Sequence, residues 1–228
     1  MTLKNRYLDS DHPLYEKHQI YIKTLMEEIP FQPRFEEAIT DARDISNLDY
    51  DSFLVLYPEG QSDIIDAIID HIIIKTENYF ENNKEDLSGV KKILHHLIMY
   101  QIQLYPQMNV IFNKIFPNLL LSMKFVRFGE SFYKIIDHLW QKAGDKATDY
   151  NYYSKRILLG NIYIETLCYS LQDNSKEFSE TAEYLTRAFD KIKIFEQIKK
   201  KLPNFEAIEE KVISFFGKMR YKSSNIKL

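Results

Sequence analysis

The stretch DHLWQKAGDKATDYNYYSKR, residues 137–156, decides how this part of the chain folds, because one predicted helix ends in it and another begins. Gly144 follows the first helix, where glycine readily adopts the left-handed conformation that ends many helices. Thr148 or Asp149 can then accept hydrogen bonds from the free N–H groups of the next helix. The sequence therefore predicts a sharp corner between two helices.

The first two turns of the second helix combine tyrosine rings with an arginine. These residues are Tyr150, Tyr152, Tyr153 and Arg156. Aromatic residues and arginine are enriched where protein surfaces bind partners. The same side chains could instead cap and staple the start of the helix. Both interpretations stay open at this point.

The corner carries the pattern Trp-x-x-Ala-Gly-Asp-x-x-Thr-Asp-aromatic-Asn-aromatic-Tyr-x-x-Arg over residues 140–156. This run resembles the signature of the ubiquinone-biosynthesis accessory family often called Coq-nine. The resemblance continues through residues 171–175, Phe178, Leu185 and Phe189. It implies a lipid-binding, TetR-like protein that assists a di-iron hydroxylase and forms a homodimer through its C-terminal helices.

The resemblance also implies which residues dock the hydroxylase. Carried over position by position, they are Asp149, Tyr152, Tyr153 and Arg156. Tyr152 stands where the family usually has Trp, so the ring is smaller and carries a hydroxyl group. We expect this difference to change the details of partner binding.

Composition predicts one helical domain. The chain has 228 residues, of which 45% are hydrophobic and 28% charged, with few Gly and Pro. This length suffices for a full core, and the composition is typical of a folded helical protein. The single Cys excludes an internal disulfide framework and suits a reducing compartment.

Helical spacing of apolar residues, interrupted by Pro and Gly, predicts an all-α bundle of about nine or ten helices, and the resemblance implies that this bundle is TetR-like. The expected helices cover residues 14–29, 34–42, 50–56, 62–81, 88–104, 130–142, 149–171 and 176–201, followed by one after Pro203. We divide the chain into a helix-turn-helix-like unit (1–60), a ligand-binding and dimerisation bundle (61–202) and an amphipathic basic helix with its tail (203–228).

Two stretches of the sequence, the N-terminal residues and the longest uncharged run, indicate where in the cell the protein is expected. Residues 1–17 contain early acids and lack the apolar core of a signal peptide or the Arg-rich character of a transit peptide. His, Gln, Pro and Asn interrupt the uncharged run 93–113, so a buried helix pair hinged at Pro106 is favoured over a membrane span. We expect a cytoplasmic protein, peripherally associated with the inner face of the cytoplasmic membrane.

The N-terminal unit has the wrong charge for reading DNA. Between Pro33 and Gly60, seven acidic residues outnumber Arg34 and Arg43, which gives a net charge of −5. A DNA-binding helix-turn-helix needs Lys and Arg against the phosphates before any base is read. The leading alternative function, a TetR-type transcriptional regulator with a hydrophobic ligand, requires a basic unit here, and nucleic acid is therefore not expected as a partner.

Motifs for catalysis are missing from the sequence. It contains neither a Gly-rich phosphate loop, nor Gly-x-Ser-x-Gly, nor the Glu-x-x-His of helical di-iron proteins. Cys168 lies on an apolar helical face, so we interpret it as a small core residue and not as a nucleophile. We therefore predict a protein that is not an enzyme, with no catalytic residue, no metal site and no cofactor.

A lipid ligand would need an apolar lining. Exposing one isoprene unit to water costs roughly 3–4 kcal/mol, so a polyprenylated intermediate must be sheltered. Ordinary core packing explains each apolar side chain equally well, and only the resemblance favours a pocket. The expected lining is Met99, Ile102, Met108, Phe112, Phe125, Phe128, Phe132, Ile135 and Leu139.

The last predicted helix has the pattern of a membrane-surface helix. Its apolar residues fall within an arc of about 100°, and residues 199–222 carry a net charge of +4. Such a helix can lie at the acyl boundary of anionic lipids, or it can pack on its own domain or a second subunit. The expected membrane-binding residues are Phe205, Ile208, Val212, Phe215, Phe216, Met219, Lys211 and Lys218.

Together with these features, the resemblance implies a non-catalytic accessory protein. Such a protein would bind isoprenoid quinone intermediates or phospholipid at the membrane surface and present the quinone intermediate to the demethoxyubiquinone hydroxylase.

Overall fold

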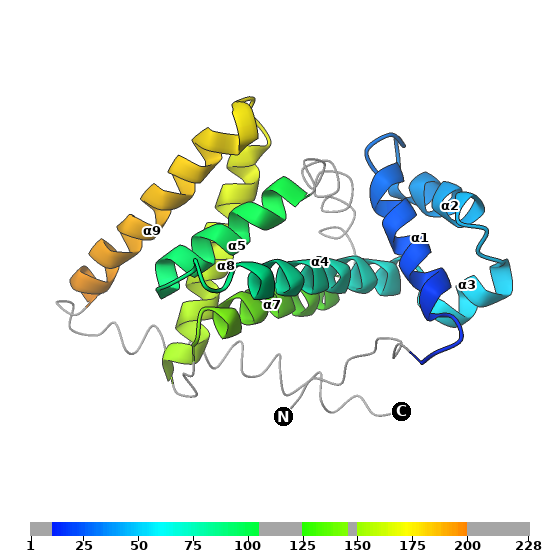
Figure 1. Ribbon diagram of the computed structural model, residues 1–228, viewed down its shortest axis with the longest axis horizontal. Coiled ribbons are helices and arrows are strands. Elements are labelled where there is room, and N and C mark those ends of the chain that lie inside the picture. Colours follow the sequence, from blue (N-terminus) through cyan, green and yellow to red (C-terminus); the bar gives the residue numbers. More distant parts are fainter. Residues whose placement is uncertain (1–10, 105–124, 146–149, 200–228) are drawn as a thin grey trace. The chain divides into compact units, whose positions relative to one another are not determined.

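The computed structural model describes residues 11–104, 125–145 and 150–199. Within these residues every regular element is a helix, as Figure 1 shows. The prediction of an all-α fold is therefore confirmed. The predicted hinge at Pro106 and the predicted helix after Pro203 lie outside the described residues.

The described helices fall into two compact units, one within residues 1–88 and 97–138 and the other within residues 89–96 and 139–228. Our predicted division at residues 60 and 202 stays a prediction. Among the described residues, no helix is both long enough and apolar enough to cross a membrane.

The first unit begins with four helices that the sequence located to within a few residues. They are α1 (Tyr15–Glu28), α2 (Phe35–Ile45), α3 (Tyr50–Leu56) and α4 (Gln61–Asn83). Helix α1 packs against both α2 and α4. Asp49 begins α3 by accepting a hydrogen bond from the backbone N–H of Ser52 at 2.8 Å, which satisfies a donor that the helix itself leaves free.

Aromatic side chains from α1, from α3 and from Tyr57 form a cluster within the first unit. The ring of Tyr21 lies 5.2 Å from that of Tyr57 and 5.7 Å from that of Phe53, measured between centroids. His18 Nδ1 and the Tyr57 hydroxyl share a hydrogen bond of 2.8 Å. His18 is 6% exposed and Tyr57 2%, so this polar contact is buried and needs its internal partner.

Helix α4 continues the core with a buried isoleucine stripe. Its buried members include Ile64, Ile65, Ile68, Ile69 and Ile72. Helices α5 (Val90–Leu104) and α7 (Phe125–Lys142) contribute residues 97–104 and 125–138 to the same unit.

Polar contacts join α4 to those helices. Gln101 Nε2 donates to Thr76 Oγ1 at 2.9 Å in the interior, and the Ser131 hydroxyl donates to the Asp66 carboxylate. These bonds fix the side chains that face one another between the helices.

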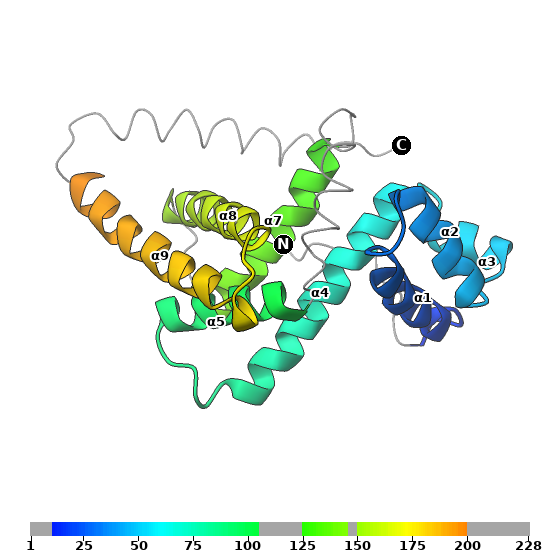
Figure 2. The same cartoon turned by 90° about the horizontal axis from the view of Figure 1, so that it is seen from above.

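The second unit is built on α8 (Tyr150–Ser170) and α9 (Ser179–Lys199), which pack against each other. Figure 2 shows α9 returning beside α8 after a short connection. The rings of Tyr169 and Tyr184 stack at 4.5 Å between centroids. Lys91, from the part of α5 in this unit, forms an ion pair of 2.6 Å with Asp190.

Asp173 organises the connection between α8 and α9. Its carboxylate accepts hydrogen bonds from the Ser175 N–H at 2.7 Å, the Thr181 N–H at 2.8 Å and the Thr181 hydroxyl at 2.5 Å. Partial desolvation opposes ionisation, but the bonds from Ser175 and Thr181 outweigh it and lower the pKa of Asp173 to about 2.

The helix predicted from residue 176 begins later, at Ser179, after a short 3₁₀ turn, η1 (Lys176–Phe178). Glu177 and Phe178 have φ angles of +55° and +57°, which a continuous α-helix does not contain. The apolar periodicity begins at Phe178, but the backbone turns sharply there.

Candidate functional site

The corner between α7 and α8 ends its first helix as the sequence predicts. Gly144 has φ of +83°. Its N–H donates to the Gln141 carbonyl at 3.0 Å, and the Asp145 N–H donates to the Trp140 carbonyl at 3.0 Å. This pair of bonds defines a Schellman motif, in which the left-handed residue is usually Gly. The motif turns the chain so that Asp145 is the first residue past the stop.

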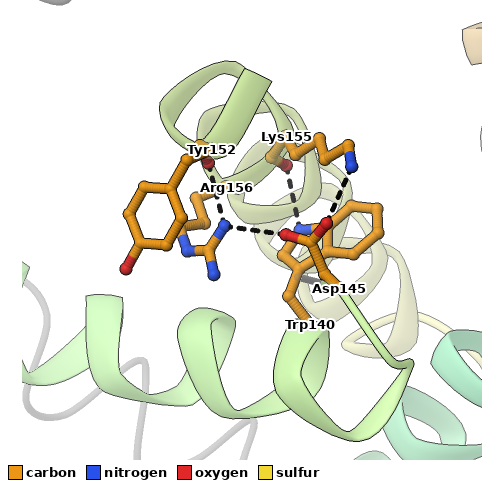
Figure 3. Close-up of polar contacts among 5 residues, drawn as sticks. All are labelled: Trp140, Asp145, Tyr152, Lys155 and Arg156. Carbon is orange, nitrogen blue, oxygen red and sulfur yellow. Dashed lines mark hydrogen bonds and ion pairs between the residues drawn. The ribbon is translucent and has the colours of Figure 1, made fainter. Parts of the chain in front are cut away.

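The Asp145 carboxylate joins this turn to α8, as drawn in Figure 3. One oxygen lies 2.7 Å from Lys155 Nζ and the other 3.2 Å from an Arg156 Nη atom. The Asp145 and Arg156 side chains are 4% and 3% exposed. Because a buried charge is costly without a partner, this carboxylate and guanidinium depend on each other.

Arg156 also holds Tyr152, one helical turn earlier. Its guanidinium donates to the Tyr152 carbonyl at 3.0 Å. The guanidinium carbon lies 3.3 Å from the centroid of the Tyr152 ring, in contact with its face (Figure 3). A cation on an aromatic face is attracted by the ring quadrupole. The arginine therefore fixes the orientation of the tyrosine ring.

Trp140 completes the corner from the α7 side. Its indole N–H donates to the Lys155 carbonyl at 3.1 Å, and Lys155 Nζ lies 5.5 Å from the centroid of its ring. Figure 3 shows these contacts converging with those of the carboxylate. We call the five residues Trp140, Asp145, Tyr152, Lys155 and Arg156 the α7–α8 cluster.

The predicted partner-binding residues take different positions around this cluster. Arg156 is buried and engaged inside the corner. Tyr152 and Tyr153 are partly exposed, and their rings meet edge to face with centroids 5.1 Å apart. Asp149 lies outside the described residues. The structure thus joins Tyr152 to Arg156 directly and brings Tyr153 beside Tyr152.

Sequence reasoning missed the contribution of Asp145, Lys155 and Trp140 to the site. One signal was present, since Asp145 directly follows the helix-stopping Gly144 and faces a Lys-Arg pair across the corner. Opposite charges on the two sides of a tight turn are candidates for pairing. Their spacing along the sequence does not say which of the two cations meets the carboxylate, and here both do.

The predicted lipid-lining residues are only partly described. In the first unit Met99, Ile102 and Ile135 are buried, and Phe132 is partly exposed. Leu139, in the second unit, is fully buried. Met108 and Phe112 lie outside the described residues, as do the side chains of Phe125 and Phe128. The buried positions suit either a core or the wall of an apolar site.

The predicted membrane-binding residues, 205–219, all lie outside the described residues. The interpretation of Cys168 as a core residue is wrong, because its side chain is exposed. The buried stripe of α8 passes through Leu159, Tyr163 and Leu167. Cys168 is rotated about 100° from Leu167 and falls outside that stripe. Among the described residues, no group of three His, Cys, Asp or Glu side chains could hold a metal ion.

Comparison with known proteins finds relatives of the segment that contains the α7–α8 cluster. Residues 127–196 match the COQ9 family model. The "Ubiquinone biosynthesis protein COQ9, mitochondrial" of Rattus norvegicus and that of Homo sapiens are each 39% identical over 51 residues. The "Ubiquinone biosynthesis protein COQ9-A, mitochondrial" of Xenopus laevis matches equally well. In each case the match covers 22% of this chain and 16% of the relative. Residues 127–196, which contain the whole α7–α8 cluster, are therefore similar to the COQ9 family, whose members above are named for ubiquinone biosynthesis, and the matches span only a small part of those relatives' length.

Proposed function

We propose that this chain is a non-catalytic, lipid-binding accessory protein that presents polyprenylated quinone intermediates to the demethoxyubiquinone hydroxylase. The observation that carries the proposal is the position of the α7–α8 cluster inside the matched segment 127–196. The names of the relatives refer to ubiquinone biosynthesis. The role of this chain in that pathway, and its partner there, are part of the proposal.

The hydroxylase would dock on the tyrosine face at the start of α8. Tyr152 is held by the Arg156 guanidinium, and Tyr153 packs against it edge to face. Ordering side chains on binding costs affinity, so rings that are already oriented make good anchors. In this arrangement Arg156 positions the Tyr152 ring and does not contact the hydroxylase, because its guanidinium is paired with Asp145 inside the corner.

The proposed lipid site requires apolar side chains that can move apart to admit a polyprenyl tail. Met99 and Ile102 on α5 and Ile135 on α7 are buried in the first unit. Burying each isoprene unit of the tail would contribute roughly 3–4 kcal/mol, which favours a sheltered site over water. Solvent extraction of the native protein followed by mass spectrometry should recover isoprenoid or phospholipid, and its repeated absence would remove this part.

We propose that residues 203–228 bind the inner face of the cytoplasmic membrane and that the chain works there as a homodimer. The basic charge and apolar arc of this segment support the membrane part. Flotation with liposomes containing anionic lipid should decrease when residues 204–228 are deleted. Sedimentation equilibrium measures the oligomeric state separately.

The whole proposal is tested by the quinone profile of cells depleted of this protein. We expect demethoxyubiquinone to accumulate and ubiquinone to fall, with both restored by the wild-type chain. An unchanged quinone profile, with altered transcripts near its gene, would favour the alternative of a TetR-type regulator. The net charge of −5 between Pro33 and Gly60 argues against that alternative.

A further inference from the structure

Helix α3 exposes several apolar side chains. None of its residues is buried. Tyr50 is 60% exposed, Leu54 45% and Val55 66%, and Ile45 at the end of α2 is 57% exposed. The Arg43 guanidinium lies 5.8 Å from the Tyr50 ring, which brings the end of α2 beside the start of α3. We call Ile45, Tyr50, Leu54 and Val55 the α2–α3 patch.

The patch is carried by a firmly held helix. At its start, Asp49 accepts hydrogen bonds from the Ser52 N–H and from Lys17 Nζ of α1, at 2.8 and 2.9 Å. Phe53 packs with its ring centroid 5.3 Å from that of the buried Tyr57. One side of α3 is thus anchored in the aromatic cluster of the first unit. The exposed apolar residues therefore belong to a preformed surface, and exposed apolar patches commonly mark interaction sites.

Acidic side chains lie around the patch. Asp44, Asp49 and Asp51 are exposed. Nearby cations are already paired, since Arg43 lies 2.9 Å from Asp44 and Lys17 2.9 Å from Asp49. Over residues 33–60 the net charge is −5. This field repels nucleic acid, anionic lipid and a second copy of the same surface.

We infer that the α2–α3 patch docks a basic amphipathic helix of a partner protein. Ile45, Leu54 and Val55 would receive its apolar face, and an amphipathic helix binds such a surface through residues spaced three and four apart. The net negative charge of residues 33–60, which remains after these ion pairs, would attract its Lys and Arg residues and speed the encounter. This inference does not depend on hydroxylase docking at α8, because the two surfaces share no residue.

The test uses the full chain and a fluorescent, amphipathic Leu/Lys helical peptide, with a Leu/Glu peptide of the same pattern as its charge control. Fluorescence anisotropy at two salt concentrations measures each affinity. We expect the Leu/Lys peptide to bind and to weaken as salt rises, and the Leu/Glu peptide to bind at least about tenfold less tightly.

Three variants locate the binding site. Leu54→Ser/Val55→Ser and Asp44→Lys/Asp51→Lys should each weaken Leu/Lys binding about tenfold or more. Ile20→Ser, which changes a 54% exposed side chain on α1, should leave it unchanged. Circular dichroism checks that each variant remains folded.

Several results would overturn the inference. These are equal binding of both peptides, equal binding by all variants, or tighter binding of duplex DNA than of the Leu/Lys peptide. If the patch variants instead abolish self-association of the chain in sedimentation, the surface belongs to a second copy and the inference is wrong.

Discussion

Arg156 and Asp145 form a buried ion pair across the corner between α7 and α8, with 3.2 Å between nitrogen and oxygen and side-chain exposures of 3% and 4%. A partner protein cannot reach this charge as the corner stands. The arginine of the signature therefore stabilises the corner from inside and orients Tyr152 at its surface. Stability and partner binding should then respond differently to substitutions in the same short segment.

Arg156→Met should destabilise the second unit by about 1–3 kcal/mol, because the Asp145 carboxylate loses its buried partner and keeps only Lys155 Nζ, 2.7 Å away. Urea unfolding followed by the fluorescence of Trp140, the single tryptophan of the chain, measures this loss inside the corner. Lys155→Met is the matched control, since the Lys155 side chain is 38% exposed. Its cost should stay near 1 kcal/mol or less. If both variants lose the same free energy of unfolding, the buried pair of Arg156 with Asp145 contributes no more to stability than the more exposed pair of Lys155 with Asp145.

Gly144→Ala should destabilise the corner by about 1–2 kcal/mol, because at φ of +83° the Cβ of an alanine crowds the adjacent backbone. Beyond its two chain neighbours a Cβ at this position would meet no atom within 4 Å, so the cost comes from the local backbone conformation and not from tertiary packing. Gly129→Ala, inside α7, is the control, because a Cβ there also meets no atom of a more distant residue within 4 Å and φ is not positive. That change should stabilise by about 0.5–1 kcal/mol. If the urea midpoints of both variants move in the same direction, the left-handed conformation of Gly144 does not explain the effect of its substitution.

Much of the helical layout follows from local chemistry and could be predicted. Apolar spacing and helix-breaking residues gave α3 its observed bounds and placed α1 and α4 to within about two residues. Gly144 ended α7 because few other residues adopt its conformation cheaply. These features depend on neighbours within one or two turns, which the sequence displays directly.

The candidate site was harder to predict because its contacts cross a turn. The Tyr and Arg residues at the start of α8 were recognised, but the spacing alone cannot show that Arg156 turns inward toward Asp145. The same limit applies to Cys168, whose exposure depends on which face of α8 packs. It also applies to Asp173, which reaches Thr181 eight residues away.

The stability of the first unit should fall as the pH drops from about 6.5 to about 4. Burial lowers the pKa of His18 to about 4, and burial together with the charges of Lys75 and His18 lowers that of His71 to about 4. Both groups take up protons first in the unfolded chain, so their stabilising effect is complete above pH 6.5 and is lost toward pH 4. Each histidine contributes at most about 3 kcal/mol to this loss.

His18→Asn should flatten this pH dependence, measured by urea unfolding and circular dichroism at several pH values, because asparagine can still bond to the Tyr57 hydroxyl but does not titrate. His71→Asn is the companion variant and should remove a similar part of the slope. An unchanged slope between pH 6.5 and 4 in His18→Asn would rule out this buried histidine as a source.

Asp173→Ala should cost about 1–2 kcal/mol, because the N–H groups of Ser175 and Thr181 lose their acceptor at the start of α9. The low folded pKa of Asp173, about 2, means that the cap is fully effective above about pH 4 and is lost as the pH falls toward 2. The stability difference between wild type and Asp173→Ala should therefore be constant from pH 7 to 4 and shrink below that. Asn174→Ala, an exposed neighbour, should change stability little; a loss as large as that of Asp173→Ala would contradict the cap.

Tyr153→Ala should weaken binding of the demethoxyubiquinone hydroxylase about tenfold or more if the tyrosine face of α8 is the docking surface. The ring is partly exposed and packs edge to face on Tyr152, so its removal takes away an anchor and leaves the Arg156–Asp145 pair in place. Biolayer interferometry with the purified hydroxylase measures the affinity, and Trp140 fluorescence in urea measures the stability of the same sample.

Tyr169→Ala is the matched control, because it removes the same side chain from the same helix, where the ring stacks on Tyr184. We expect it to leave the hydroxylase affinity unchanged even if it lowers stability. If Tyr153→Ala lowers stability without changing affinity, the signature tyrosines staple the helix start and the docking surface lies elsewhere. If both variants weaken binding in proportion to their loss of stability, the effect is general unfolding of α8. A selective loss of affinity in Tyr153→Ala is the result that the geometry of the α7–α8 cluster predicts.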